Sequence, residues 1–216
     1  MKVFVIHYKK LIDRKKNIIE QFKKYNISNY EFIEIDRDEL NEEDFNMFVK
    51  NFPTYHIAIT LSHLYAYKQI SEKYDDGLIF EDDIILSDDF INIYNKYINQ
   101  LPIDYDMFFI GDGCNLHIEN NKLLPDKNVY EKCLYPTGWG GDGGTRCIDS
   151  YLVNKKCAIE IVNYFNNLTE KITLPPDWFL NVVIRNKQFK IYWAEPTIVT
   201  QGSQCGIFER SIKNIN

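Results

Sequence analysis

Residues 77–86 form an apolar, β-branched stretch of strand length, interrupted in its middle by the consecutive carboxylates Glu81, Asp82 and Asp83. Burying an unpaired charge costs several kcal/mol, and adjacent like charges also repel one another. The three carboxylates are therefore not expected within a sheet. We predict a strand that ends at Phe80, with the acidic triplet in the loop that follows it.

The position of this triplet indicates a ligand site. In open α/β sheets, ligands bind at the carboxyl ends of the strands. Hard oxygen ligands gathered at such a point suit Mg²⁺ or Mn²⁺, usually shared with a phosphorylated substrate. The alternative is a solvated acidic turn, in which residues 87–89 cap the next helix. Because the flanking apolar run makes the triplet a strand end, we favour the metal or phosphate interpretation.

The length and charge of the chain exclude several classes of protein. The 216 residues fit one domain, residues 1–216, with a substantial core, and the net charge of -6 argues against a nucleic-acid partner. No apolar run approaches the ~20 residues of a transmembrane segment, and the apolar start is too short for a signal peptide. The five cysteines are odd in number and include no CxxC pair, which argues against zinc and makes a reducing, intracellular (cytoplasmic) compartment the expectation. The missing signal peptide argues against a protein of the secretory pathway and leaves a bacterial or viral cytoplasmic protein open.

Apolar periodicity predicts alternating strands and helices, followed by a less regular second half. Strands are expected at residues 3–6, 30–36, 77–80, 105–110, 145–153 and 189–193. Helices are expected at residues 11–25, 55–74, 88–101, 155–165 and 175–186, with Asn154 capping the fourth. Residues 114–128 are expected to be mainly loop. This order indicates an α/β fold with a mixed, mainly parallel sheet flanked by helices, and an irregular antiparallel C-terminal half.

Several short motifs occur in a characteristic order along the chain. Val5-Ile6-His7 is followed by Asp13-Arg14, Leu61-Ser62-His63 and the acidic triplet, and then by residues 150–156, Pro176-Asp177 and Glu195-Pro196 leading to Gln201. This order resembles glycosyltransferase family 25, which includes lipooligosaccharide and collagen galactosyltransferases. The resemblance spans nearly the whole chain. It implies a GT-A (Rossmann-like) fold, a UDP-sugar donor and Mn²⁺ (or Mg²⁺) as cofactor.

The implied metal fits the chemistry of the triplet. Transfer from a UDP-sugar creates negative charge on the departing diphosphate, and a divalent ion held by carboxylates neutralises it. The resemblance makes the triplet the counterpart of a D-x-D motif, with Asp83 as the first metal ligand. Glu81 is a further ligand or, like Asp82, contacts the ribose or a metal-bound water. Since no histidine follows His117, Gln201, Ser203 or water is left as the third ligand.

The resemblance also implies residues that bind the donor. It places Arg14 against the nucleotide, where a guanidinium pairs well with phosphate, and includes His7 in the same site. Asp36 is a candidate to bind uridine. Ser62 and His63 are implied as donor-site residues by the family pattern alone. The alternatives are that Arg14 is an exposed helix arginine, that Asp36 is an ordinary turn aspartate and that His63 is a core histidine.

Asp177 is the candidate catalytic base, because inverting transfer needs a carboxylate near the acceptor hydroxyl. It follows two prolines at the start of a helix. The alternative is structural, since acids are favoured at helix N-termini, where the positive helix end would also lower the pKa.

The glycine-rich segment 138–144 is expected to be either a lid, with Trp139 stacking on a sugar, or a mobile connection. Asp142 and Arg146 are further candidates to face the acceptor.

Taken together, these features predict a metal-dependent, inverting glycosyltransferase that moves galactose or glucose from UDP to a hydroxyl of a glycan or of hydroxylysine. One alternative is an inactive nucleotide-sugar-binding protein, which would keep the donor pocket but need not keep Asp177. A metallo-phosphohydrolase is less favoured, because the chain offers no His/Asp ligand set for a two-metal centre.

Overall fold

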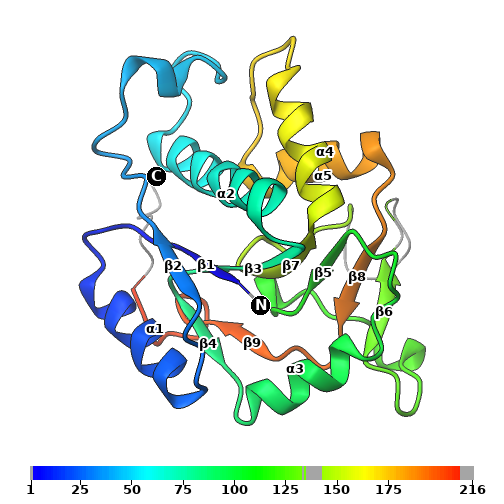
Figure 1. Cartoon of the computed structure of the whole chain (residues 1–216). Coiled ribbons are helices and arrows are strands. Elements are labelled where there is room, and N and C mark those ends of the chain that lie inside the picture. Colours follow the sequence, from blue (N-terminus) through cyan, green and yellow to red (C-terminus); the bar gives the residue numbers. More distant parts are fainter. Residues whose placement is uncertain (1, 133, 135–142, 210–216) are drawn as a thin grey trace.

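The computed structural model describes residues 2–132, 134 and 143–209 of the chain. A seven-stranded sheet lies at its centre, in the order β2-β1-β3-β7-β5-β8-β6 (Figure 1). Its strands are β1 (Val3–Ile6), β2 (Tyr30–Ile33), β3 (Asp76–Glu81), β5 (Met107–Phe109), β6 (Val129–Lys132), β7 (Ser150–Asn154) and β8 (Ile191–Ala194). A separate two-stranded sheet pairs β4 (Ile84–Leu86) with β9 (Val199–Gln201).

The strand directions confirm the mixed, mainly parallel sheet. β1 is parallel to β2 and β3, and β5 is parallel to β8. β7 lies antiparallel between β3 and β5, and β6 is antiparallel to β8. Thus β1, β2, β3, β5 and β8 share one direction, and β6 and β7 oppose it. The opposing strands both come from the second half of the chain, as expected.

Helices cover both faces of the sheet (Figure 1). α2 (Thr54–Lys73), α4 (Lys155–Asn166) and α5 (Pro176–Lys187) lie on one face, and α1 (Ile12–Lys24) and α3 (Phe90–Ile98) lie on the other with the β4–β9 ribbon. Short 3₁₀ turns occur at η1 (Glu42–Phe45), η2 (Gly113–Asn115) and η3 (Asn120–Lys122). None of the helices in the described ranges combines the length and apolar character that a membrane span requires.

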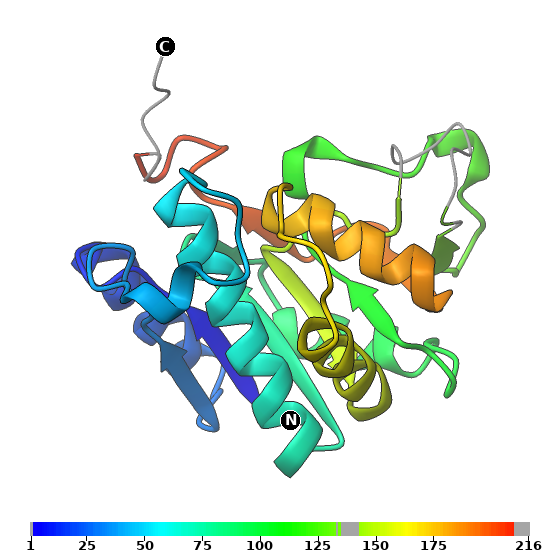
Figure 2. The same cartoon turned by 90° about the horizontal axis from the view of Figure 1, so that it is seen from above.

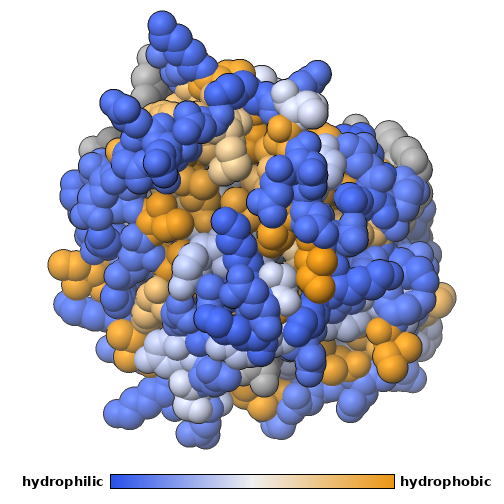
Figure 3. Space-filling view, turned by 45° about the horizontal axis from the view of Figure 1, so that its top comes forward, coloured by the Kyte–Doolittle hydropathy of each residue, from blue (hydrophilic) through white to orange (hydrophobic). Residues whose placement is uncertain are grey.

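The core explains why the strands are apolar on both sides. In β1, Phe4 and Ile6 join the cluster beneath α2 and α4, whereas Val3 and Val5 join the cluster beneath α1 and α3. Successive side chains of a strand point to opposite faces, so a strand covered on both faces has no polar side. In the space-filling view, hydrophilic residues cover most of the face shown, with hydrophobic residues in patches between them (Figure 3).

The structure differs from the sequence prediction at three places. β3 continues through Glu81, one residue beyond the expected end, so only Asp82 and Asp83 form the turn. The apolar residues after the triplet form β4, a strand that was not predicted, because they pair with β9. Neither β9 nor β6 was predicted, since each is short and is defined by a distant partner strand. The predicted cap of α4 is confirmed: the Asn154 side chain accepts from the Cys157 N–H at 2.8 Å.

The parallel strands β1, β2 and β3 end at the same edge of the sheet. Seen from above, the start of α2, the start of α5 and the chain that follows β9 also lie along one edge of the molecule (Figure 2). This is the kind of edge at which open α/β sheets bind ligands.

Candidate functional site

A pocket of about 620 Å³ lies at the ends of β1 and β3. Its size is that of a typical small-molecule site. Among its lining residues are eight of the predicted site residues: His7, Arg14, Ser62, Glu81, Asp82, Asp83, Gln201 and Ser203. Asp36, His63 and Asp177 are not among them. The β4–β9 pairing brings Gln201 beside the triplet, because Gly202 N–H donates to the Asp83 carbonyl at 2.6 Å.

The Asp82 carboxylate is fully engaged within the protein. It accepts from Arg14 Nη1 at 2.8 Å and from the Tyr8 N–H at 3.1 Å, and it lies 2.8 Å from His7 Nδ1. Arg14 is itself buried and also donates to the Glu209 carbonyl at 2.7 Å. Arg14 is therefore not an exposed helix arginine. Its positive charge neutralises Asp82, and its hydrogen bond to Asp82 holds the turn that carries Asp83.

Asp83, by contrast, is buried with an unpaired oxygen. Among the described residues, its Oδ1 has no hydrogen-bond partner, and its Oδ2 lies 3.8 Å from Arg14 Nη1, beyond hydrogen-bond range. Burial raises the pKa of Asp83, although a hydrogen bond from Ser203 and the charge of Arg14 oppose this shift. Burial and then the negative charge of Asp83 raise the pKa of neighbouring Glu81 well above its ordinary value. Arg14, 3.8 Å from Asp83 Oδ2, therefore compensates the charge of the two carboxylates only in part.

The donor set fits a metal ion that shares its ligands with a substrate. Within the described ranges, no group of three or more His, Cys, Asp or Glu side chains is arranged to hold a metal. Mg²⁺ is usually bound by one or two carboxylates together with substrate phosphates and water. Glu81 and Asp83, with the orphaned Oδ1 of Asp83, match that kind of site. Gln201 lies in the same pocket, where its Oε1 accepts from Gln204.

The sequence analysis missed a third carboxylate, Asp149, next to this pair. Asp149 is fully buried immediately before β7, and its carbonyl accepts from the Glu81 N–H at 2.8 Å. Its Oδ2 accepts from Ser150 Oγ at 2.8 Å, whereas Oδ1 has no hydrogen-bond partner in the part of the chain that the structure describes. Burial raises the pKa of Asp149 to about 7. No local pattern marks this residue, because its position depends on the pairing of β7 with β3.

Ser62 and His63 point to different places from α2. Ser62 lines the pocket, whereas His63 is buried behind it with Nδ1 2.7 Å from the Tyr151 hydroxyl. Burial lowers the pKa of His63 to about 3, so the ring is neutral. Within the described ranges, its Nε2 has no hydrogen-bond partner, and it lies 3.9 Å from Glu81 Oε1. These contacts agree with the alternative that His63 is a core histidine, one that packs behind Glu81.

Asp36 belongs to a turn beside the pocket. Its side chain is buried and accepts from the Asp38 N–H at 2.9 Å, as in an ordinary Asx turn. The residues on either side, Ile35 and Arg37, line the pocket instead. The Arg37 guanidinium lies 4.2 Å from the centre of the Tyr8 ring. Arg37 was not singled out from the sequence, because nothing in its local pattern distinguishes it from a surface arginine.

Asp177 lies in the first turn of α5, as predicted, but its electrostatics differ from the expectation. Burial raises the pKa of Asp177, and this outweighs the lowering by the N–H groups of Trp178 and of Asp177 itself. The expectation that the helix end would lower the pKa was therefore wrong in its net direction. The charge of Asp177 contributes to the raised pKa of Glu81, so the two carboxylates are close enough to interact.

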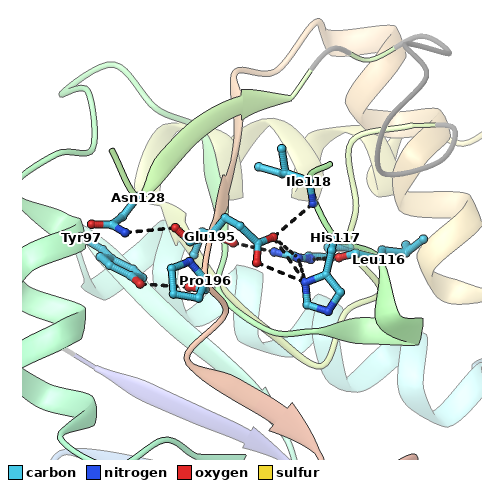
Figure 4. A network of polar contacts seen from close by, with 9 residues as sticks. Tyr97, Leu116, His117, Ile118, Asn128, Glu195 and Pro196 are labelled. Atoms are coloured by element: carbon cyan, nitrogen blue, oxygen red, sulfur yellow. Dashed lines mark hydrogen bonds and ion pairs between the residues drawn. The ribbon is translucent and has the colours of Figure 1, made fainter. Parts of the chain in front are cut away.

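Arg146 does not face an acceptor. It is fully buried, with Nη2 2.8 Å from Glu195 Oε2 and Nη1 2.6 Å from the Ala194 carbonyl. Glu195 also accepts from the Ile118 N–H at 3.2 Å and lies beside His117 (Figure 4). This network joins the chain before β7 to the end of β8. The candidates Trp139 and Asp142 lie outside the described residues.

The fold and the acidic pocket define a mixed α/β protein with a nucleotide-sized site at the strand ends. The model of a family described as glycosyltransferase family 25 (LPS biosynthesis protein) matches residues 1–131, more than half of the chain. The chain therefore belongs to glycosyltransferase family 25. The glycosyltransferase class, which the motifs implied, and the mixed α/β architecture are confirmed.

Solved structures with a broadly similar architecture include known transferases. The catalytic domain of Drosophila β1,4-galactosyltransferase 7 with xylobiose gives a TM-score of 0.49 at 12% identity, covering 100% of this chain and 76% of that one. A mutant of that enzyme in complex with manganese, UDP-Gal and xylobiose gives a TM-score of 0.46 at 13% identity, covering 93% of this chain and 67% of that one. The galactosyltransferase LgtC, in complex with donor and acceptor sugar analogues, gives a TM-score of 0.44 at 14% identity, covering 88% of this chain and 71% of that one. Such scores identify no substrate. Among curated proteins, no sequence matches the chain.

Proposed function

We propose that this glycosyltransferase is metal-dependent and transfers galactose or glucose from a UDP-sugar to a hydroxyl of a glycan or of hydroxylysine, with inversion. The observation that carries the proposal is the unpaired Oδ1 of Asp83, buried at the wall of the 620 Å³ pocket beside Glu81. A buried carboxylate with an unpaired oxygen, next to a second carboxylate that is partly exposed, is costly to keep. A divalent ion with a diphosphate would satisfy it.

Asp83 and Glu81 would hold Mn²⁺ or Mg²⁺, with Gln201 as the nearby amide ligand. When bound, the ion supplies positive charge that stabilises the diphosphate leaving group. Arg14 and His7 act through Asp82, because their hydrogen bonds hold the turn in place. This role replaces the direct nucleotide contact that the family motif implied for Arg14.

The remaining pocket walls suit a nucleoside. Ile6, Ile35 and Ile59 supply apolar surface, and Ser62 and Arg37 supply polar groups. Ligand sites of this size are typically apolar with a few placed polar groups. The uridine and ribose are therefore proposed to lie against α2 and the end of β2, with the diphosphate toward the carboxylates.

Asp177 is proposed to take the proton from the acceptor hydroxyl. Its raised pKa makes it a stronger base than an exposed aspartate. Its electrostatic contact with Glu81 puts it near the metal pair, although it does not line the donor pocket itself. That position is consistent with an acceptor approaching beside the donor.

Measurement of UDP release tests this proposal. The protein is incubated with UDP-galactose or UDP-glucose and acceptor, with and without Mn²⁺. We expect release that requires Mn²⁺ and falls by about 100-fold or more in Asp83→Ala. Asp88→Ala, a change at a fully exposed carboxylate, should behave as wild type. UDP binding with no release from any donor would support the inactive binding protein, and equal release without metal would refute the metal dependence.

A further inference from the structure

Two cysteines from distant parts of the chain meet at the edge of the pocket. The Sγ atoms of Cys114 and Cys147 lie 3.2 Å apart, and both residues are free thiols. Cys114 is exposed and lines the pocket, whereas Cys147 is partly buried. We propose that Cys114 and Cys147 are a redox-active pair that closes to an intramolecular disulfide at this wall. The proposal concerns a modification site and does not rest on the transferase reaction.

The backbone around the pair is held for this approach. A side chain at Gly113 would place its Cβ 2.6 Å from Cys147 Cβ and 2.5 Å from the Arg146 carbonyl, so only glycine permits the two segments to lie this close. Arg146 in turn donates from Nε to the Leu116 carbonyl at 2.5 Å and is fixed by Glu195. Both thiols are therefore attached to anchored segments. Forming the bond requires the sulfur atoms to move from 3.2 Å to about 2.05 Å.

The exposure of the two thiols sets the order of the chemistry. A soluble disulfide, such as oxidised glutathione, reacts first with the Cys114 thiolate, which gives a mixed disulfide and releases one glutathione thiolate. Burial raises the pKa of the Cys147 thiol, so Cys147 keeps its proton until this step. Cys147 then attacks the Cys114 sulfur. The protein disulfide forms, the second glutathione leaves as thiolate, and the Cys147 proton neutralises a glutathione thiolate.

The other described cysteines differ in their surroundings. Cys157 is fully buried in the core beneath α4, where an oxidant has no access. Cys205 is exposed, and its Sγ lies 3.6 Å from the Gly202 carbonyl. Gln204 lies 3.6 Å from Cys114 Sγ and lines the pocket. Cys205 follows Gln204 in the chain and is exposed, so it is the competing disulfide partner of Cys114 that an experiment must distinguish.

Disulfide mapping of the full chain tests the proposal directly. The reduced protein is treated with oxidised glutathione, its remaining thiols are alkylated, and it is digested with trypsin. We expect peptide 97–122 joined to peptide 147–155, at a mass two hydrogens below the sum of the two. The joined species should be absent from Cys114→Ser and from Cys147→Ser. It should persist in the control Cys205→Ser.

Thermal unfolding gives a second readout. The disulfide closes a long loop, so oxidation should raise the Tm of wild type and of Cys205→Ser by roughly 5 to 10 °C, and that of Cys147→Ser not at all. The proposal is overturned if Cys114 is joined instead to Cys205 or Cys133. It is also overturned if glutathione accumulates on Cys114 without the internal link. Neither readout depends on a sugar donor, so both remain valid if the proposed transfer reaction fails.

Discussion

Asp82 and Asp83 are adjacent in the sequence but differ in what surrounds them. Asp82 is neutralised by Arg14 and hydrogen-bonded by His7 and Tyr8. Asp83 keeps an unpaired oxygen and a raised pKa. The difference follows from the place of α1, which brings Arg14 Nη1 to hydrogen-bond distance of Asp82, at 2.8 Å, but leaves it 3.8 Å from Asp83 Oδ2. We therefore assign a structural role to Asp82 and propose a metal-binding role for Asp83.

At Asp177 we expect an effect on turnover with little effect on donor binding. Asp177→Asn removes the proposed base, so kcat should fall by about 10²- to 10⁴-fold while the Kd for UDP stays within about threefold. Kinetics of UDP release and a UDP binding titration provide the two values. Glu170→Gln, at an exposed carboxylate nearby in the chain, is the matched control. An unchanged kcat in Asp177→Asn would remove Asp177 from the mechanism.

Asp149 should make stability depend on pH. Its folded-state pKa of about 7 exceeds the ordinary value of 3.8, so the folded state binds the proton more tightly than the unfolded state does. Wild-type stability is thus lost as pH rises from about 4 to about 7. Asp149→Asn removes this loss. Without divalent ions, its free energy of unfolding should match wild type near pH 4 and exceed it by up to about 4 kcal/mol at pH 8. Urea unfolding of both proteins across this pH range measures the difference in the free energy of unfolding. A difference that stays constant with pH would contradict the prediction.

At the scale of elements, the sequence predicted what depends on local pattern. β1, α1, α2 and β3 follow from apolar runs and helical spacing, and the end of β3 was correct to within one residue. β4, β6 and β9 were not predicted, because strands of three or four residues are defined by their partners. The site shows the same division. The triplet was visible as charge at a strand end, but Asp149 becomes its neighbour only through the pairing of β7 with β3.

The N-terminus of α4 offers a test of a local prediction. Asn154 accepts from the Cys157 N–H and also donates to the Tyr105 carbonyl. Asn154→Ala should therefore lower the free energy of unfolding by about 1 to 2 kcal/mol. Urea denaturation measures this loss. Asn166→Ala, at the exposed last residue of the same helix, should change stability by less than about 0.5 kcal/mol. Equal losses in both variants would show that the cap contributes nothing.

At the scale of the whole molecule, the Arg146–Glu195 pair joins the chain before β7 to the end of β8. Arg146→Met leaves Glu195 buried without its partner, so the free energy of unfolding should fall by about 3 to 5 kcal/mol. Adding Glu195→Gln should recover part of that loss. Lys187→Met breaks a more exposed pair with Glu160 and should cost at most about 1 kcal/mol. A loss in Arg146→Met no greater than in Lys187→Met would argue against the network.

We propose that Asp83 holds a divalent ion, which in turn holds the diphosphate of the donor. Calorimetric titration of UDP, with Mn²⁺ and then with chelator, measures this link without needing the acceptor. We expect wild type and Asp88→Asn to bind UDP about tenfold more tightly, or better, with Mn²⁺ than without it. Asp83→Asn should bind UDP equally weakly in both. If Asp83→Asn keeps the manganese dependence of wild type, the account of this site is contradicted.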